Sequence, residues 1–162
     1  MFGGAFGLGG MSDDVGDIGC NGCDYNPISF GFMGHIGGFL SPRFALMFEG
    51  QVNGQQVSQA AFPEDDAFLY QSAAMVAGQY WITPQLWVKG GIGFAHLEEQ
   101  SADGFFQSNI DNGTAIMGAI GYEVFSSRLF SVDLEGRLLN GAYKGIDNNI
   151  TAGTVGVGVN WF

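Results

Sequence analysis

Two cysteines lie close together in the segment Cys20-Asn21-Gly22-Cys23. An even cysteine count outside the cytoplasm favours a disulfide, and Asn-Gly is a turn that would bring the two thiols together. Free thiols or a metal site are the alternatives. Redox catalysis of the thioredoxin kind is disfavoured, because that motif requires a βαβ context that this sequence lacks. We therefore expect a structural disulfide between Cys20 and Cys23.

A second group of reactive side chains occurs in segments where apolar and polar residues alternate. Because successive side chains of a strand point to opposite faces, these charges would share the face opposite the apolar one. If that face encloses an interior, they form either a path for protons or ions, or a hydrogen-bonded plug. Buried charges are tolerated only when they are paired, which favours the plug. The predicted polar network consists of Glu49, Lys89, Glu123, Asp133, Glu135 and Arg137.

Most of the other acids cluster between the alternating segments. Carboxylate oxygens suit divalent cations, but the run from Asp13 to Asp17 lacks the full spacing of a calcium-binding loop. We therefore expect solvated acidic loops, no metal site and no cofactor. The clusters are Asp13, Asp14, Asp17 and Asp24; Glu64, Asp65 and Asp66; and Glu98, Glu99 and Asp103.

Composition narrows the possible classes of protein. The 162 residues include 28 glycines, and 46% are hydrophobic while only 13% are charged. There is no run of 18 apolar residues, so the sequence predicts no transmembrane helix. The net charge of −11 argues against nucleic acid as a partner, because such binding needs a basic surface. The length predicts one domain over residues 1–162. No secretory leader is recognisable, so we expect a mature or trimmed chain.

Alternation with a period of two residues is the strongest structural signal. In Leu86–Leu97, for example, Leu86, Val88, Ile92 and Phe94 share one face. Most candidate strands are about 10 to 14 residues long, which suits a tilted membrane crossing of about 9–11 residues better than a globular strand of about 5–6. The eight candidates are Phe2–Met11, Ile28–Phe39, Phe44–Val52, Phe68–Trp81, Leu86–Leu97, Thr114–Val124, Leu129–Leu139 and the segment 154–161.

The connections between these candidates alternate in length. Short turns at 40–43, 82–85 and 125–128 alternate with long loops at 12–27, 53–67, 98–113 and 140–150. This pattern is typical of transmembrane barrels, which have short periplasmic turns and longer outer loops. Strands over more than half of the chain would be implausible in a soluble domain, but a closed barrel needs them to pair every backbone group in lipid. The sequence thus predicts an all-β fold, an eight-stranded antiparallel up-and-down transmembrane barrel.

The distribution of charge assigns the two faces of the predicted strands. No Asp, Glu, Lys or Arg falls on the apolar face at mid-strand, where a Lys or Arg would cost about 2–4 kcal/mol in lipid. A soluble barrel would show the inverse arrangement. His35 falls on the interior face and is expected to be a hydrogen-bonded filler. Trp81 and Trp87 share that phase and either close one mouth or are ordinary strand-end aromatics. A periplasmic aromatic girdle is expected from Phe44, Tyr80, Tyr122, Phe125, Phe130 and Trp161.

In this architecture the chain resembles the small eight-stranded outer-membrane barrels, the OmpA- and OmpX-like group. The resemblance implies the outer membrane of a Gram-negative bacterium, with membrane lipid and the barrel-insertion machinery as partners. The last strand looks like the terminal signal that this machinery reads, with Thr154, Gly156, Val159 and Trp161 at its key positions. The family usually ends on the aromatic residue, whereas here Phe162 follows, which shifts the register by one.

The function expected from these features is a structural or surface-interaction barrel at the cell surface. Its interior would be plugged by side chains, and its acidic loops would meet an extracellular ligand or protein. The alternative is a narrow channel or a conduit for small hydrophobic molecules. A lipid-modifying enzyme is disfavoured: some eight-stranded barrels of this kind use a His with a Ser near the outer rim, but His96 close to Glu98 and Ser101 is a weak signal. No enzymatic activity is expected.

Overall fold

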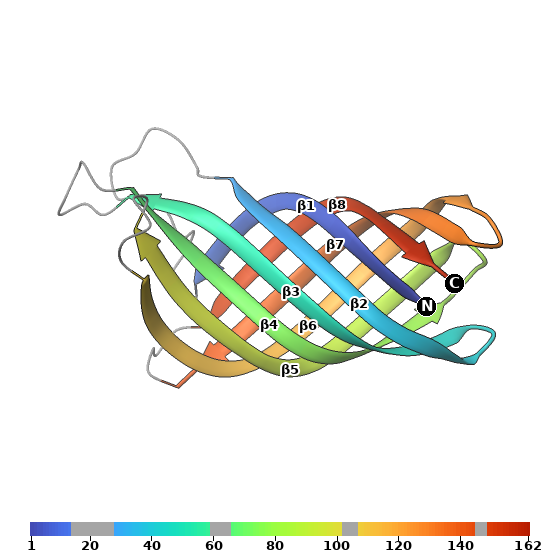
Figure 1. Cartoon of the computed structure of the whole chain (residues 1–162), viewed down its shortest axis with the longest axis horizontal. Coiled ribbons are helices and arrows are strands. Elements are labelled where there is room, and N and C mark those ends of the chain that lie inside the picture. Colours follow the sequence, from blue (N-terminus) through green and yellow to red (C-terminus); the bar gives the residue numbers. More distant parts are fainter. Residues whose placement is uncertain (14–27, 59–65, 102–106, 145–148) are drawn as a thin grey trace.

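The computed structural model describes residues 1–13, 28–58, 66–101, 107–144 and 149–162. Each strand pairs antiparallel with the next, and the last strand pairs with the first, so that the sheet closes into a barrel (Figure 1). Within these ranges no helix is long and apolar enough to cross a membrane. The strands are β1 (Phe2–Asp13), β2 (Ser29–Ser41), β3 (Phe44–Ser58), β4 (Asp66–Trp81), β5 (Leu86–Ser101), β6 (Gln107–Ser126), β7 (Phe130–Tyr143) and β8 (Ile150–Trp161).

The predicted eight-stranded antiparallel barrel is thereby confirmed, but several strands are longer than the sequence indicated. Pairing of β3 with β4 continues through Gln55↔Leu69, and pairing of β5 with β6 continues through Glu99↔Ser108. The prediction that 53–67 and 98–113 are loops throughout is therefore wrong. These strand ends lie beyond the apolar band, where polar residues are tolerated on both faces and the alternation disappears.

The three short turns join strands at one end of the barrel, the end at which both chain termini lie (Figure 1). Only two residues, Pro42 and Arg43, separate β2 from β3. In the turn before β5, the hydroxyl of Thr83 accepts a hydrogen bond from the amide of Leu86 at 3.0 Å. Ser127 does the same for the amide of Phe130 before β7, at 3.1 Å. These hydroxyls pair amides that would otherwise lack a partner in a tight turn.

The register fixes the tilt of the strands. A row of directly paired residues that starts at Trp161 of β8 passes around the barrel and returns to β8 at Thr151, ten residues from its start. The row runs through Phe2, Ile36, Phe48, Val76, Ile92, Ile116 and Asn140. A stagger of this kind requires strands inclined to the barrel axis by about 35–45°. The interior of an eight-stranded barrel is only wide enough to be filled by side chains.

Burial alternates along each strand and separates an interior from an outer face. The interior contains apolar side chains from several strands, among them Met47, Met75, Met117 and Leu139, each at most 4% exposed. The outer face is apolar and exposed, as Ile92 at 68% and Phe94 at 77% illustrate. Such a surface fits lipid hydrocarbon, because its apolar side chains then contact lipid chains and not water. The face assignment made from the sequence is confirmed by this burial.

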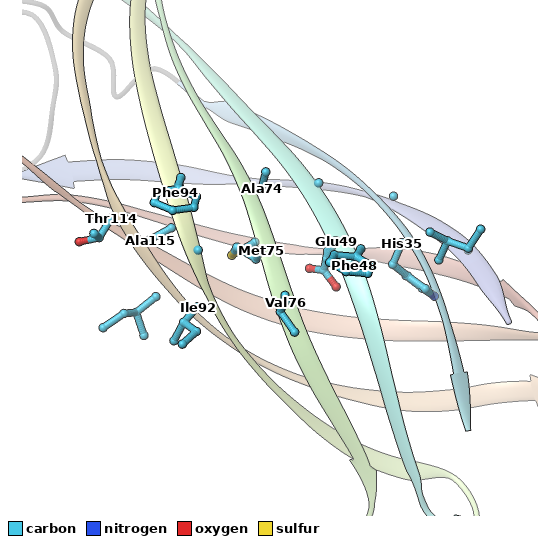
Figure 2. Close-up of a pocket in the computed structure, with 16 residues that line it drawn as sticks. His35, Phe48, Glu49, Ala74, Met75, Val76, Ile92, Phe94, Thr114 and Ala115 are labelled. Atoms are coloured by element: carbon cyan, nitrogen blue, oxygen red, sulfur yellow. The ribbon is translucent and has the colours of Figure 1, made fainter. Parts of the chain in front are cut away.

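A shallow trough crosses the outer face of β2–β6 (Figure 2). Three small outward-facing residues, Gly34, Gly50 and Ala74, lie side by side on paired strands and form its floor. Phe94, which pairs directly with Ala74, bounds one end. The trough encloses about 1170 Å³, and its walls are apolar side chains such as Phe48 and Val76. In the membrane we expect lipid chains to fill this space.

Candidate functional site

Four charged side chains meet in the middle of the interior. The carboxylate of Glu49, on β3, accepts a hydrogen bond from the ammonium of Lys89, on β5, at 3.1 Å, and it also pairs with the guanidinium of Arg137, on β7. Arg137 reaches Glu135 at 3.3 Å and the side-chain oxygen of Gln51 at 3.3 Å. All of these side chains are at most 8% exposed. Glu49 thus links the two interior cations that the sequence predicted.

The other two acids of the predicted network lie nearer the short turns, where neutral donors bind them. The indole nitrogen of Trp81 donates to Glu123 at 2.7 Å, and that of Trp87 donates to Asp133 at 3.2 Å. Asn160 also donates to Asp133, at 2.6 Å. Asp133 thus belongs to the interior polar set, but its partners are neutral donors and not Lys89 or Arg137. Within the described ranges, neither Glu123 nor Asp133 forms an ion pair.

The sequence placed the two tryptophans on the interior face, either closing one mouth or as ordinary strand-end aromatics, and did not predict that they bind the acids. Trp81 and Trp87 are 8% and 1% exposed and point inward, so both do more than terminate a strand. Each indole has one N–H group and needs an acceptor when buried, and each acid needs a donor. That complementarity is a signal that buried indoles and acids pair, but it does not say which indole binds which acid. Ser131, which donates to Asp133 at 3.2 Å, carried no such signal.

His35 differs from the expectation of a hydrogen-bonded filler. It is 7% exposed and points into the interior from β2, as predicted, but neither ring nitrogen has a hydrogen-bond partner among the described residues. The nearby Arg137 also leaves its Nε without a partner. A void of about 10 Å³ beside Arg137, Glu135 and Gln51 is enough for about one water molecule. Side chains thus occupy nearly all of the interior at this level.

His96 lies on the outer face of β5, toward the end with the long connections. Its ring nitrogens approach Asn112 Oδ1 and Glu98 Oε1, both at 2.8 Å. The sequence had grouped His96 with Glu98 and Ser101; the side chain of Ser101 lies outside the described residues. The structure brings together His96 and Glu98, and it adds Asn112 from β6. Within the described part of the chain, no three acidic, His or Cys side chains are arranged to hold a metal ion.

Some of the remaining sites predicted from the sequence lie among the described residues, and others lie outside them. In β8, Thr154 and Gly156 take the inward phase, while Val159 and Trp161 take the outward phase beside β1 and β7. Their role as an insertion signal stays a prediction. Cys20 and Cys23 lie outside the described residues, so their disulfide also stays a prediction. The same holds for most of the acidic loop residues, although Asp13, Asp66, Glu98 and Glu99 lie in strands rather than in loops.

Comparison with known proteins gives structural matches only. No family model matches the sequence, and no curated protein matches it. Neisserial surface protein A matches with a TM-score of 0.64 and 13% identity, covering 99% of this chain and 96% of that one. Ail, the attachment invasion locus protein of Yersinia pestis, matches with a TM-score of 0.59 and 11% identity, covering 98% and 95%. The chain has the fold of a small outer-membrane β-barrel.

This agreement covers 95–96% of the length of the two neighbours and therefore concerns the complete barrel. At 11–13% identity it carries the fold and no residue roles. Together with the exposed apolar face, the fold places the chain in a bacterial outer membrane. The OmpA- and OmpX-like resemblance inferred from the sequence agrees with both neighbours.

Proposed function

We propose that this barrel is a surface-interaction scaffold whose interior is closed to solutes. The observation that carries the proposal is the network around Glu49, which joins β3, β5 and β7 across the interior. Each of its charges has at least one partner, so opening a path would separate ion pairs in a region of low dielectric constant. The residual void beside the network is about 10 Å³, far less than a hydrated ion needs.

The outward-facing end of the proposed scaffold carries the acidic segments. Their charge is strongly negative, because 12 of the 16 acids of the sequence lie in or beside the long connections, against one of the five bases, Lys144. Ail has been crystallised with the heparin analogue sucrose octasulfate, which is a polyanion. An acidic surface repels such a ligand, so the partner proposed for this chain is a cationic or neutral surface rather than a sulfated glycan.

Conductance across a planar bilayer tests the closed interior. The refolded protein should give a flat current trace, or only rare small events, because the ion pairs of Glu49 obstruct the axis. A variant in which Glu49, Lys89 and Arg137 are all replaced by Ala removes the obstruction and should conduct. This variant shows that the measurement can detect an open barrel. Steady conductance by the unmodified protein, at the level of a general porin, would replace the scaffold proposal with a channel.

A lipid-modifying activity has less support. His96 and Asn112 form the kind of contact that orients a catalytic imidazole, but the second ring nitrogen faces Glu98 rather than a hydroxyl. The hydroxyl of Ser72, on the neighbouring strand, donates to the main-chain oxygen of His96 at 3.4 Å, so it is not held against the ring. We propose no enzymatic role for this cluster.

A further inference from the structure

A pocket of about 360 Å³ opens at the end of the barrel that carries the short turns. It lies at the mouth of the interior, which we call the periplasmic vestibule, and its lining includes Phe39, Arg43, Trp81, Glu123 and Phe162. Its volume is in the range that binds small molecules in proteins. The proposed scaffold function does not use this pocket.

Aromatic rings form a continuous wall along the vestibule. The ring of Phe39 lies 5.3 Å from that of Trp81 and 5.8 Å from that of Phe162, measured between centroids. Phe39 and Trp81 take the inward phase of their strands, and Phe162 follows the last residue of β8. Phe39 and Phe162 are nevertheless 46% and 44% exposed, because the mouth is open there. Exposed aromatic faces at an aqueous opening are a favourable surface for a cation, since the ring quadrupole is negative at its face.

The innermost polar group of the vestibule is the carboxylate of Glu123. The residue is 4% exposed, and one of its carboxylate oxygens accepts the indole N–H of Trp81 at 2.7 Å. The other oxygen accepts no hydrogen bond from any described residue. Asp133 is the cross-strand neighbour of Glu123, is fully buried, and likewise has only neutral partners.

Two buried acids lie side by side here, and neither forms an ion pair with any described residue. Removing a charge from water is costly unless an opposite charge accompanies it. Arg43 lines the pocket but is exposed, and it forms no ion pair with Glu123. The vestibule therefore combines an acidic site, at the free oxygen of Glu123, with an aromatic wall.

We propose that the periplasmic vestibule binds a small organic cation, a quaternary ammonium. The positive charge lies against the free oxygen of Glu123, and the methyl or methylene groups pack on Trp81 and Phe39. A carboxylate combined with aromatic faces recognises such a group better than a hydrated metal ion, because a quaternary ammonium has no N–H groups, is weakly hydrated and gains apolar contacts through its alkyl groups. The ligand enters from the periplasmic side.

The indole N–H of Trp81 is a built-in reporter, because it donates directly to Glu123. The experiment titrates tetramethylammonium into ¹⁵N-labelled protein in maltoside micelles, which carry no charge, and follows the tryptophan indole resonances. The Trp81 signal is assigned by its loss in Trp81→Phe. We expect a saturable shift of this signal, while the indole of Trp161, which faces lipid, stays in place.

A neutral molecule of similar size and shape, tert-butyl alcohol, tests the role of charge in the unmodified protein. It should shift the Trp81 signal at least about tenfold less at equal concentration, because it carries no charge for the carboxylate of Glu123 and the aromatic faces to attract. Potassium chloride at the same ionic strength should produce no saturable shift. An equal response to tert-butyl alcohol or to potassium would overturn the proposal.

The matched variants are Glu123→Gln and Glu98→Gln. The first keeps an acceptor for Trp81 but removes the charge, and it should weaken tetramethylammonium binding at least about tenfold. The second removes one negative charge at the opposite end of the barrel and should leave binding unchanged. Equal weakening by both would mean general attraction to a negative protein, and no weakening by Glu123→Gln would mean that the carboxylate is not the site. Either result would overturn the proposal.

Discussion

Glu49 is the residue on which the interior network depends most, because it pairs with both Lys89 and Arg137. Glu49→Gln would leave two buried cations with one acceptor fewer, and breaking a buried ion pair in this way costs about 3–5 kcal/mol. We expect a loss of that order in the free energy of unfolding, measured by urea titration of the lipid-reconstituted protein. Glu135→Gln removes a single 3.3 Å contact and should cost less. Equal losses would contradict the central place of Glu49.

Gly121 provides a test of packing around the buried indoles. A Cβ atom at Gly121 would overlap the ring of Trp87, which is 1% exposed and has no space to withdraw. Gly121→Ala should therefore destabilise the barrel by about 1–3 kcal/mol, as overpacked cores do. Gly118→Ala on the same strand is the control, because nothing lies within 4 Å of its Cβ position. Thermal unfolding of both variants should separate them; similar midpoints would show that the indole can shift.

For single residues the sequence predicted which side chains point into the interior, but not which of them bind one another. Alternation was enough to place Glu49, Lys89 and Arg137 in one interior. The pairing of Asp133 with Trp87 and Asn160 was not predictable, because it depends on the stagger between strands that are distant in the chain. His35 was placed correctly, but its lack of a hydrogen-bond partner follows from the positions of several neighbouring side chains.

Individual strands depend on their apolar outer face for insertion. Ile92 lies on the outer face of β5 and is 68% exposed. Ile92→Arg should impair folding into vesicles by about 2–4 kcal/mol, the cost of an Arg on the lipid face near the midplane. Ala119→Ser, on the interior side of β6, is the control and should have a mild effect. The folded fraction in vesicles across a urea series is the measurement. Normal folding of Ile92→Arg would contradict the lipid-facing assignment.

Strand boundaries were predictable only where lipid imposes a pattern. Inside the membrane an apolar residue must alternate with an inward one, so the start of β7 was predicted to within one residue, whereas its end lies four residues beyond the predicted Leu139. Beyond the membrane the same backbone ladder continues with polar residues on both faces, as in the last residues of β3. Backbone hydrogen bonds continue through these extensions, and hydrogen bonding between strands leaves no periodic trace in a single sequence.

The molecule as a whole has a strongly negative charge, with its sequence acids concentrated in and beside the long connections. Protein in nanodiscs should therefore bind immobilised polylysine at low salt and be released as the salt concentration approaches about 1 M, where the screening length is about 3 Å. Immobilised heparin should retain none of it. Retention on heparin at physiological salt would contradict the proposed preference for cationic or neutral surfaces.

The overall architecture was the feature that the sequence predicted best. Eight long alternating segments and connections of alternating length admit few arrangements, because a sheet in lipid must close on itself. The ten-residue stagger was not predictable, since many registers satisfy the same alternation.

Both chain ends lie at the mouth with the short turns (Figure 1), and this decides where the protein can carry added sequence. The amide of Phe162 donates to Leu129, and its ring packs on Phe39, so a tag attached after Phe162 would emerge directly over the vestibule. A tag before Met1 would leave from the same side, where the terminal amine bonds Gly37. Any passenger meant for display outside the cell must therefore be inserted into a connection at the other end, for example between Lys144 and Asn149.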